Sequence, residues 1–202
     1  MVKPIIISEA GFYHFIQDQA GELVVYALCL SSEDIDIEVE QTVEDCSVSI
    51  YGLCFIDSKD SVRIHTHVKH LACRGKSEQI IKFVLNGEAK GEFFGELYIA
   101  KDAQQVDAQQ TNRNILLSRQ ASMRTRPQLI IYADDVKASH GATTGQLDEN
   151  ALFYMQQRGL SKETAQQLLL QAFVKDVLPL TADGISEHIQ QRLFALGIGE
   201  EL

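Results

Sequence analysis

The sequence predicts a mainly β fold that is followed by a helical segment near the C-terminus. Two observations carry this prediction. Between residue 5 and about residue 132, short apolar runs with a period of two start every dozen or so residues, separated by Gly, Asn, Asp and Ser. After Gly145 the apolar residues recur with the spacing of an amphipathic helix. The strand pattern alone fits a sandwich, a barrel or a β-solenoid, and it does not choose among them.

The expected strands follow directly from these apolar runs. Residues 23–30 form a continuous apolar run, and residues 35–39 alternate strictly. Asn86-Gly87 is a strong turn signal, and Pro127 is expected to start the last strand. The expected strands cover residues 23–30, 35–39, 48–56, 62–68, 80–85, 93–99 and 129–132. Residues 5–16, with their aromatic side chains, are expected to cover the N-terminal end of the β region; otherwise that sheet edge is open and favours a homodimer.

Three helices are expected after the β region. The first runs from Asp148, a good N-cap, to Arg158, and Gly159 suits a left-handed stop. The second is capped by Ser161 and runs to about residue 177, and the third spans about residues 183–197. The predicted apolar stripe of the second helix consists of Ala165, Leu168, Leu169, Ala172 and Phe173. Helices of this length are marginal alone, so they are expected to pack on the β region and on another protein.

Composition excludes several classes of protein. The 202 residues, 45% of them hydrophobic, fit one globular domain or one domain with a small appendage. Acidic side chains far outnumber basic ones in residues 1–60, which argues against a nucleic-acid binder. No apolar run approaches the ~20 residues that cross a bilayer, and no signal peptide is evident, so a cytoplasmic or equivalent reducing location is expected. No nucleotide-binding or nucleophile-elbow motif is present in the sequence.

Two groups of residues are candidates for metal or sulfur chemistry. His65, His67 and His70 form an H-x-H-x-x-H pattern. Residues two apart on a strand share a face, so His65 and His67 could hold a metal if a bend brought His70 to them. This keeps open the alternative of a metal-dependent enzyme on a cupin-like β fold. The four cysteines form no C-x-x-C pair and are expected to be small apolar fillers, with a cluster or persulfide role as the second reading.

The segment Ala133–Asp148 carries a more specific signal. It reads ADDVKASHGATTGQLD and is followed by Leu-Phe-Tyr at 152–154 and Gln-Arg-Gly at 157–159. This segment resembles the signature of the SufB/SufD family, the scaffold subunits of the SUF iron–sulfur cluster assembly complex. His140 followed by Gly141 is closer to the SufD branch, because the SufB branch has a glutamate there. The resemblance extends back through residues 95–100 and 109–118 and forward to about residue 180.

The resemblance implies a right-handed parallel β-helix over residues 1–145 and a helical subdomain over residues 146–202. It implies a non-catalytic scaffold subunit that pairs with a SufB-like subunit and docks a SufC-like ABC ATPase. His140, placed by sequence in a turn between strand and helix, would lie at the SufB contact and serve cluster assembly there. The implied ATPase-docking residues are Phe153, Tyr154, Leu168, Leu169 and Phe173. The chain alone would bind no cofactor, because the cluster forms in the heteromeric complex.

Two departures from the family pattern limit which family properties the resemblance implies for this chain. The family commonly has a cysteine before its Ser-His pair, and this chain has Ala138. A thiolate ligand at that position is therefore excluded. Family members are also roughly twice as long, with a longer β-helix and an N-terminal helical region.

Overall fold

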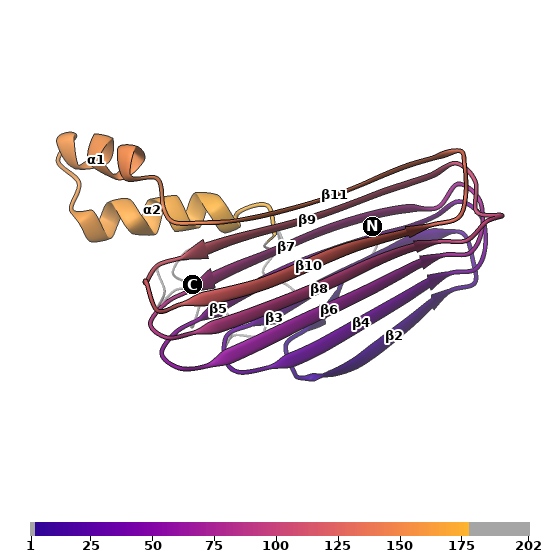
Figure 1. The fold of residues 1–202 in the computed structure, drawn as a ribbon, viewed down its shortest axis with the longest axis horizontal. Coiled ribbons are helices and arrows are strands. Elements are labelled where there is room, and N and C mark those ends of the chain that lie inside the picture. The colour runs from indigo at the N-terminus through magenta and orange to yellow at the C-terminus, as the bar shows by residue number, and fades with distance from the viewer. Residues whose placement is uncertain (1–2, 178–202) are drawn as a thin grey trace.

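The protein is a parallel β-solenoid with two helices at the C-terminal end of the described chain (Figure 1). The computed structural model describes residues 3–177. Successive strands alternate between two sheets, here called sheet A and sheet B. Sheet A has the order β1-β3-β5-β7-β9-β11, and sheet B has the order β10-β8-β6-β4-β2. The solenoid expected from the resemblance is confirmed, while its handedness and the boundary at residue 145 stay predictions.

The strands lengthen from the N-terminal edge toward the middle of the stack. Sheet A consists of β1 (Ile5–Ile7), β3 (Gly21–Cys29), β5 (Cys46–Ile56), β7 (Lys76–Leu85), β9 (Val106–Leu116) and β11 (Val136–Gly145). Sheet B consists of β2 (Gly11–Gln17), β4 (Asp34–Gln41), β6 (Ser61–His70), β8 (Lys90–Ile99) and β10 (Ser122–Ile131). The helices are α1 (Glu149–Gln157) and α2 (Lys162–Val174). No helix in residues 3–177 is long and apolar enough to cross a membrane.

The core lies between the two sheets, where inward side chains stack in register. Val39, Val68 and Leu97 are paired across β4, β6 and β8, and none of them has accessible surface. Because every strand of this stack is parallel, each turn places its apolar side chains on those of the turn before it. The period-two pattern of the sequence is therefore the pattern of this shared interior.

Beyond residue 20, the structure has two strands that sequence patterning missed, β9 and β11, and it starts β10 before the expected residue. On β9 the inward positions Gln110, Asn112 and Asn114 are polar, so the apolar alternation that marks a strand is absent. β11 is mostly exposed, and it occupies a stretch expected to be a turn. Pro127 lies inside β10 and does not start a strand. It is tolerated there because β10 is the last strand of sheet B, where a missing N–H can face away from the ladder.

The prediction that residues 5–16 cover the N-terminal end is wrong. These residues form β1 and β2, which extend the two sheets by one edge strand each. Tyr13 and Phe15 turn inward and pack on the core, whereas Phe12 and Ile16 point outward and are exposed. This segment therefore pairs with the edges of the two sheets and does not cover the end of the solenoid.

The first two helices have the predicted caps. Asp148 accepts hydrogen bonds from the backbone N–H groups of residues 150 and 151, and Ser161 accepts one from residue 164. Gly159 has a φ of +91°, the left-handed conformation expected of a helix stop. The predicted stripe of α2 is wrong in part, because the buried residues are Ala165, Leu170 and Val174. The third predicted helix, at about residues 183–197, lies outside the described residues.

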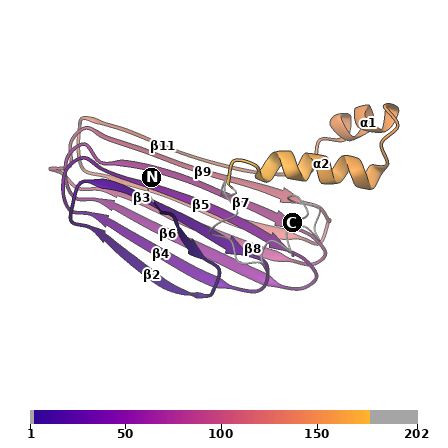
Figure 2. The same cartoon turned by 180° about the vertical axis from the view of Figure 1, so that it is seen from behind.

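The C-terminal part of α2 packs on the outer face of sheet A. Leu170, Val174 and Val177 form one apolar cluster with outward residues of the sheet. The buried sheet residues of that cluster are Leu28, Leu53, Phe55, Val84 and Ile115. In both views α1 lies beyond the ends of the strands, away from the sheets (Figures 1 and 2). The helical pair is thus anchored at one end and projects at the other.

Candidate functional site

His140 lies in the middle of β11 and is exposed. Its expected position in a turn between strand and helix is wrong, because Val136–Gly145 pairs along its whole length with β9. The acidic pair Asp134-Asp135 forms the bend before this strand. β11 is the last strand of sheet A in the described chain, so one of its edges has no strand partner there.

The face of β11 that carries His140 is the face that points between the sheets. Register pairs His140 with Gln110 on β9, and Gln110 is buried in the interior. Ala138, two residues earlier on the same face, packs against the core. His140 is nevertheless exposed, because β10 and β11 are the last strands of the described stack. The open end of the solenoid therefore carries His140 on its inner side.

Buried amide side chains lie directly beneath this open end. Asn114 donates from Nδ2 to Asn112 Oδ1 at 2.7 Å, to Thr143 O at 3.1 Å and to Thr144 Oγ1 at 3.1 Å. Asn112 in turn donates to the Ile81 carbonyl oxygen at 3.1 Å. These bonds tie β11 to the strand below it through side chains as well as through the backbone ladder. The inner side of the last turns is thus polar, in contrast to the aliphatic turns before it.

The predicted docking residues of the helices fall into two groups. Phe153 and Tyr154 on α1 are 63% and 60% exposed, and Leu168 on α2 is 41% exposed. Leu169 is half-buried, and Phe173 packs against the cluster on sheet A. No residue of α1 is buried. The available apolar surface therefore lies on α1 and on the first half of α2, and Phe173 serves the docking of α2 on its own solenoid.

Lys82 fastens the end of α2 to sheet A. This lysine is only 2% exposed, although it points to the outer face of β7. Its Nζ donates to the Phe173 carbonyl oxygen at 2.5 Å and to the Asp176 carboxylate, and it lies 4.7 Å from the centre of the Phe173 ring. A lysine at the carbonyl end of a helix satisfies orphan carbonyls and complements the helix dipole. Sequence reasoning missed this residue, and an isolated lysine in a strand gives no signal of it.

The three histidines of the H-x-H-x-x-H pattern do not converge. His65 and His67 lie on the outer face of β6, whereas His70 points inward, is fully buried and bonds Ser77 Oγ at 2.9 Å. Burial lowers the pKa of His70 from 6.5 to about 4. An odd residue spacing on a straight strand separates His70 from the other two by the thickness of the sheet. Within residues 3–177 the strands form two open parallel sheets and the three histidines share no site, so this part of the chain does not support the cupin-like alternative.

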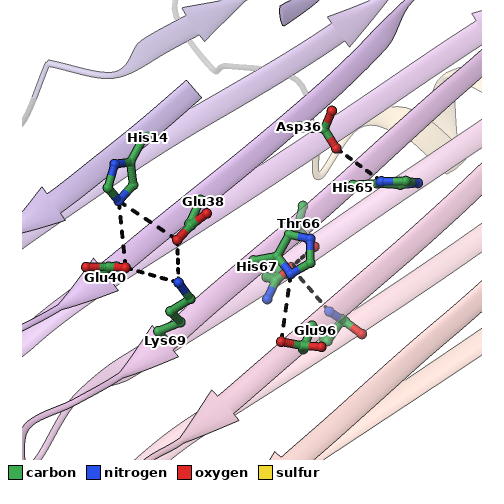
Figure 3. Close-up of polar contacts among 11 residues, drawn as sticks. His14, Asp36, Glu38, Glu40, His65, Thr66, His67, Lys69 and Glu96 are labelled. Atoms are coloured by element: carbon green, nitrogen blue, oxygen red, sulfur yellow. Dashed lines mark hydrogen bonds and ion pairs between the residues drawn. The ribbon is translucent and has the colours of Figure 1, made fainter. Parts of the chain in front are cut away.

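The outer face of sheet B pairs its histidines with carboxylates (Figure 3). His65 Nδ1 lies 3.0 Å from Asp36 Oδ1, and His67 Nδ1 lies 3.8 Å from Glu96 Oε1. The pairs repeat from strand to strand because the parallel register places a histidine and a carboxylate side chain next to each other. This part of the face thus consists of paired histidines and carboxylates, with the ring of Phe94 next to those of His65 and His67.

One corner of this face brings a histidine and two carboxylates together. His14 Nε2 lies 4.0 Å from Glu38 Oε1 and 3.9 Å from Glu40 Oε1, a spacing that could suit a metal ion. Lys69 already donates to both carboxylates, with 3.0 Å to Glu40 (Figure 3). Its hydrogen bond lowers the pKa of Glu38, and the same bond raises the pKa of Lys69. The ammonium group of Lys69 thus already occupies an oxygen of each carboxylate.

The prediction of apolar fillers in strands is confirmed for three of the four cysteines, whereas Cys73 lies in a turn and donates to the Asp102 carbonyl oxygen at 3.2 Å. Cys29, Cys46 and Cys54 are buried, and Cys73 is half-buried. Cys29 and Cys54 are partners on neighbouring strands in the interior. Burial, with a smaller contribution from Cys29, raises the pKa of the Cys54 thiol, so this sulfur is a thiol and not a thiolate at neutral pH.

Comparison with known proteins bears directly on this geometry. The family model described as "SUF system FeS cluster assembly, SufBD core domain" matches residues 14–173, which covers β3 to β11 and nearly all of α2. The chain belongs to the SufB/SufD family. A SufB/SufD core is thus formed by the strands of both sheets together with the helical pair.

Curated relatives place the chain in the SufD branch of the SufB/SufD family. The iron-sulfur cluster assembly protein SufD of Escherichia coli is 32% identical over 74% of this chain and 36% of its own length. A SufBD family protein of Synechocystis is 33% identical over 71% of this chain and 32% of its own length. The chloroplastic protein ABCI7 of Arabidopsis thaliana is 33% identical over 71% and 30%. The chain therefore spans about a third of the length of these relatives.

Sequence reasoning missed most of the polar interior near His140. The missed residues are Gln79, Gln110, Asn112 and Asn114. A signal was present on β9, where amide side chains recur at every second position from residue 110 to residue 114. Such alternation is the period of a strand with a polar inner face, and it could have indicated both the strand and its unusual side chains.

Proposed function

We propose that this chain is a non-catalytic scaffold subunit of a SUF-type iron–sulfur cluster assembly complex. The observation that carries the proposal is the match of the SufBD core model to residues 14–173, which spans the solenoid and the helical pair. Residues 3–177 offer no convergent set of catalytic side chains in a closed pocket. The iron and sulfur of the cluster are cargo, and they are assembled by the whole complex and not by this chain alone.

A SufB-like subunit would join at the open end of the solenoid. β11 offers ten residues of edge strand, and an exposed edge of this kind accepts a strand from a partner. His140 lies in the middle of this strand and faces the open end. Within the contact, its imidazole would stand at the boundary of the two subunits, where it could serve cluster assembly.

A SufC-like ABC ATPase would dock on the projecting helices. Phe153 and Tyr154 expose aromatic surface on a helix that buries no residue of its own. Exposed aromatic side chains on a helix are typical anchors of a protein interface. Leu168 on α2 is a further exposed apolar side chain of the helical pair, and Leu169 next to it in the sequence is half-buried. The anchored end of α2 would carry movement of the ATPase to the solenoid.

Co-expression with the SufB-like and SufC-like proteins of the same cell tests both contacts separately. Phe153→Glu places a charge on the helix surface and should lose the ATPase while keeping the SufB-like subunit. Ala142→Lys places a charge on the exposed edge strand and should lose the SufB-like subunit while keeping the ATPase. Thr143→Ala, on the same strand, is the matched control. Retention of both partners by both charged variants would contradict the proposal.

A further inference from the structure

A chain of hydrogen-bonded side chains runs along the interior of the solenoid toward His140. Thr66, Gln79 and Gln110 are each 0% exposed. Thr66 Oγ1 donates to Gln79 Oε1 at 2.6 Å, and Gln110 Nε2 donates to the same oxygen at 3.3 Å. Thr66 belongs to β6, Gln79 to β7 and Gln110 to β9, so the chain ascends turn by turn. His140 is the register partner of Gln110 on the next and last strand of sheet A.

The amide of Gln110 contacts that of Gln79, whose own Nε2 is also buried without a hydrogen-bond partner among the described residues. The NH₂ group of Gln110 faces Gln79, so its Oε1 faces away from that contact, and this buried oxygen has no hydrogen-bond partner within residues 3–177. A Cβ atom at Gly95 would lie 2.2 Å from Gln110 Nε2, so glycine at this position leaves the room that the amide occupies. A buried acceptor without a donor is costly, so its retention calls for a donor that arrives from elsewhere.

His140 can supply that donor. The two side chains project from neighbouring parallel strands on the same face, where directly opposite side chains lie within contact distance. A neutral imidazole has one N–H donor and one acceptor nitrogen. When a partner covers the open end and turns the exposed ring inward, the Gln110 oxygen is the acceptor beneath it.

We propose that Gln110 is a positioning residue for His140. Its Oε1 accepts the N–H of one ring nitrogen, which leaves the lone pair of the other nitrogen directed at the covered interface. The hydrogen bond of one ring nitrogen decides which tautomer is present and where the ring points. This inference rests on the proposed function, because it takes His140 as the side chain that this chain contributes to cluster assembly.

The test measures the initial rate of cluster formation by the complete complex carrying variants of this chain. Gln110→Met removes the acceptor at nearly constant size, and we expect the rate to fall by about tenfold, as for a lost buried hydrogen bond. Gln110→Glu retains an acceptor oxygen but loses the NH₂ donor to Gln79 Oε1, so it should restore only part of the rate. Gln109→Met, on the outer face of the same strand, is the control and should match the wild type.

The outcomes separate this inference from the proposed function. If His140→Ala forms clusters as fast as the wild type, the role of His140 itself is wrong. If His140→Ala is slow but Gln110→Met matches the wild type, only the role of Gln110 is overturned. Equal loss in Gln110→Met and Gln110→Glu at unchanged melting temperature also overturns it. If Gln110→Met does not fold, Gln110→Asn replaces it in the test. This variant keeps the amide but shortens the side chain by one methylene, and the inference requires that it also lowers the rate of cluster formation.

Discussion

The outer faces of the two sheets are built in opposite ways. On sheet A, outward Leu53 and Val84 have no accessible surface and belong to one apolar cluster with Leu170 and Val174 of α2. On sheet B, outward positions carry charged pairs such as Asp34 with Arg63, 2.9 Å apart. Both faces come from the same strand alternation, since the interior takes every second residue of each strand. The outward-facing residues of each strand decide whether that face of the sheet packs against a helix or remains exposed to solvent.

This difference explains why the helical pair sits where it does. Removing apolar side chains from water stabilises the docked helix, whereas exposed ion pairs gain little by being covered. The helices therefore anchor on sheet A, and α1 is left projecting with its aromatic side chains available. Four predictions test this comparison, from the largest expected effect to the smallest.

Leu53→Ala should be the most damaging of the four changes. Leu53 is 0% exposed and belongs to the apolar cluster that the end of α2 joins, and truncating such a side chain should lower the free energy of unfolding by about 2–5 kcal/mol. Urea unfolding followed by circular dichroism measures this loss. A loss below about 1 kcal/mol, the range of an exposed site, would mean that α2 does not cover this face in solution.

His70 should make stability depend on pH, because it is buried on the inner side of β6. Its folded pKa is about 4, below the ordinary 6.5, so between these values the unfolded chain binds a proton that the folded chain does not. The free energy of unfolding should therefore fall as pH falls through this window, by on the order of 3 kcal/mol in total. His70→Gln should flatten this part of the pH profile in urea titrations, and an unchanged slope would contradict the assignment.

Lys82→Met should release the end of α2 with a smaller effect on the whole protein. The substitution removes the bonds to Phe173 and Asp176 but keeps an apolar stem in the buried site. Because Asp176 is half-exposed and can return to water, the cost should be about 1–2 kcal/mol. Hydrogen exchange should speed up in α2 and stay unchanged in β4 and β6. A uniform increase in hydrogen-exchange rate across the solenoid would contradict a role of Lys82 that is limited to the end of α2.

Lys69→Met on sheet B should have the smallest effect. Its partners Glu38 and Glu40 remain partly in contact with water, so the loss should be about 0–1 kcal/mol and should shrink further in high salt. The same unfolding measurement at two ionic strengths checks this. A loss as large as that of Leu53→Ala would remove the contrast between the two faces.

The sequence predicted the aliphatic turns well and the last turns poorly, for one physical reason. The sequence of residues 48–56 predicts a strand because its inward side chains are apolar. On β9 the inward side chains are amides that satisfy one another, and on β11 most positions are exposed, so neither strand carries the usual pattern. His140 was identified through a family motif, and its place on an edge strand required the register with β9.

The helices show the same limit in another form. Caps at Asp148 and Ser161 are local and were predicted correctly. The face that α2 buries depends on the sheet against which it packs. Leu170 and Val174 are buried there, although helical periodicity favoured a stripe that contains neither of them. Lys82 could not be predicted, since its partners are more than ninety residues away in the sequence.

The most direct test of the scaffold account is the composition of the complex that this chain forms in its own cell. Native mass spectrometry of the tagged chain, purified at low salt without cross-linking, reports every subunit and its copy number. The account predicts an assembly that contains this chain, a SufB-like subunit and a SufC-like ATPase. A monomer, or a homodimer that carries neither partner under conditions where both are expressed, would contradict it.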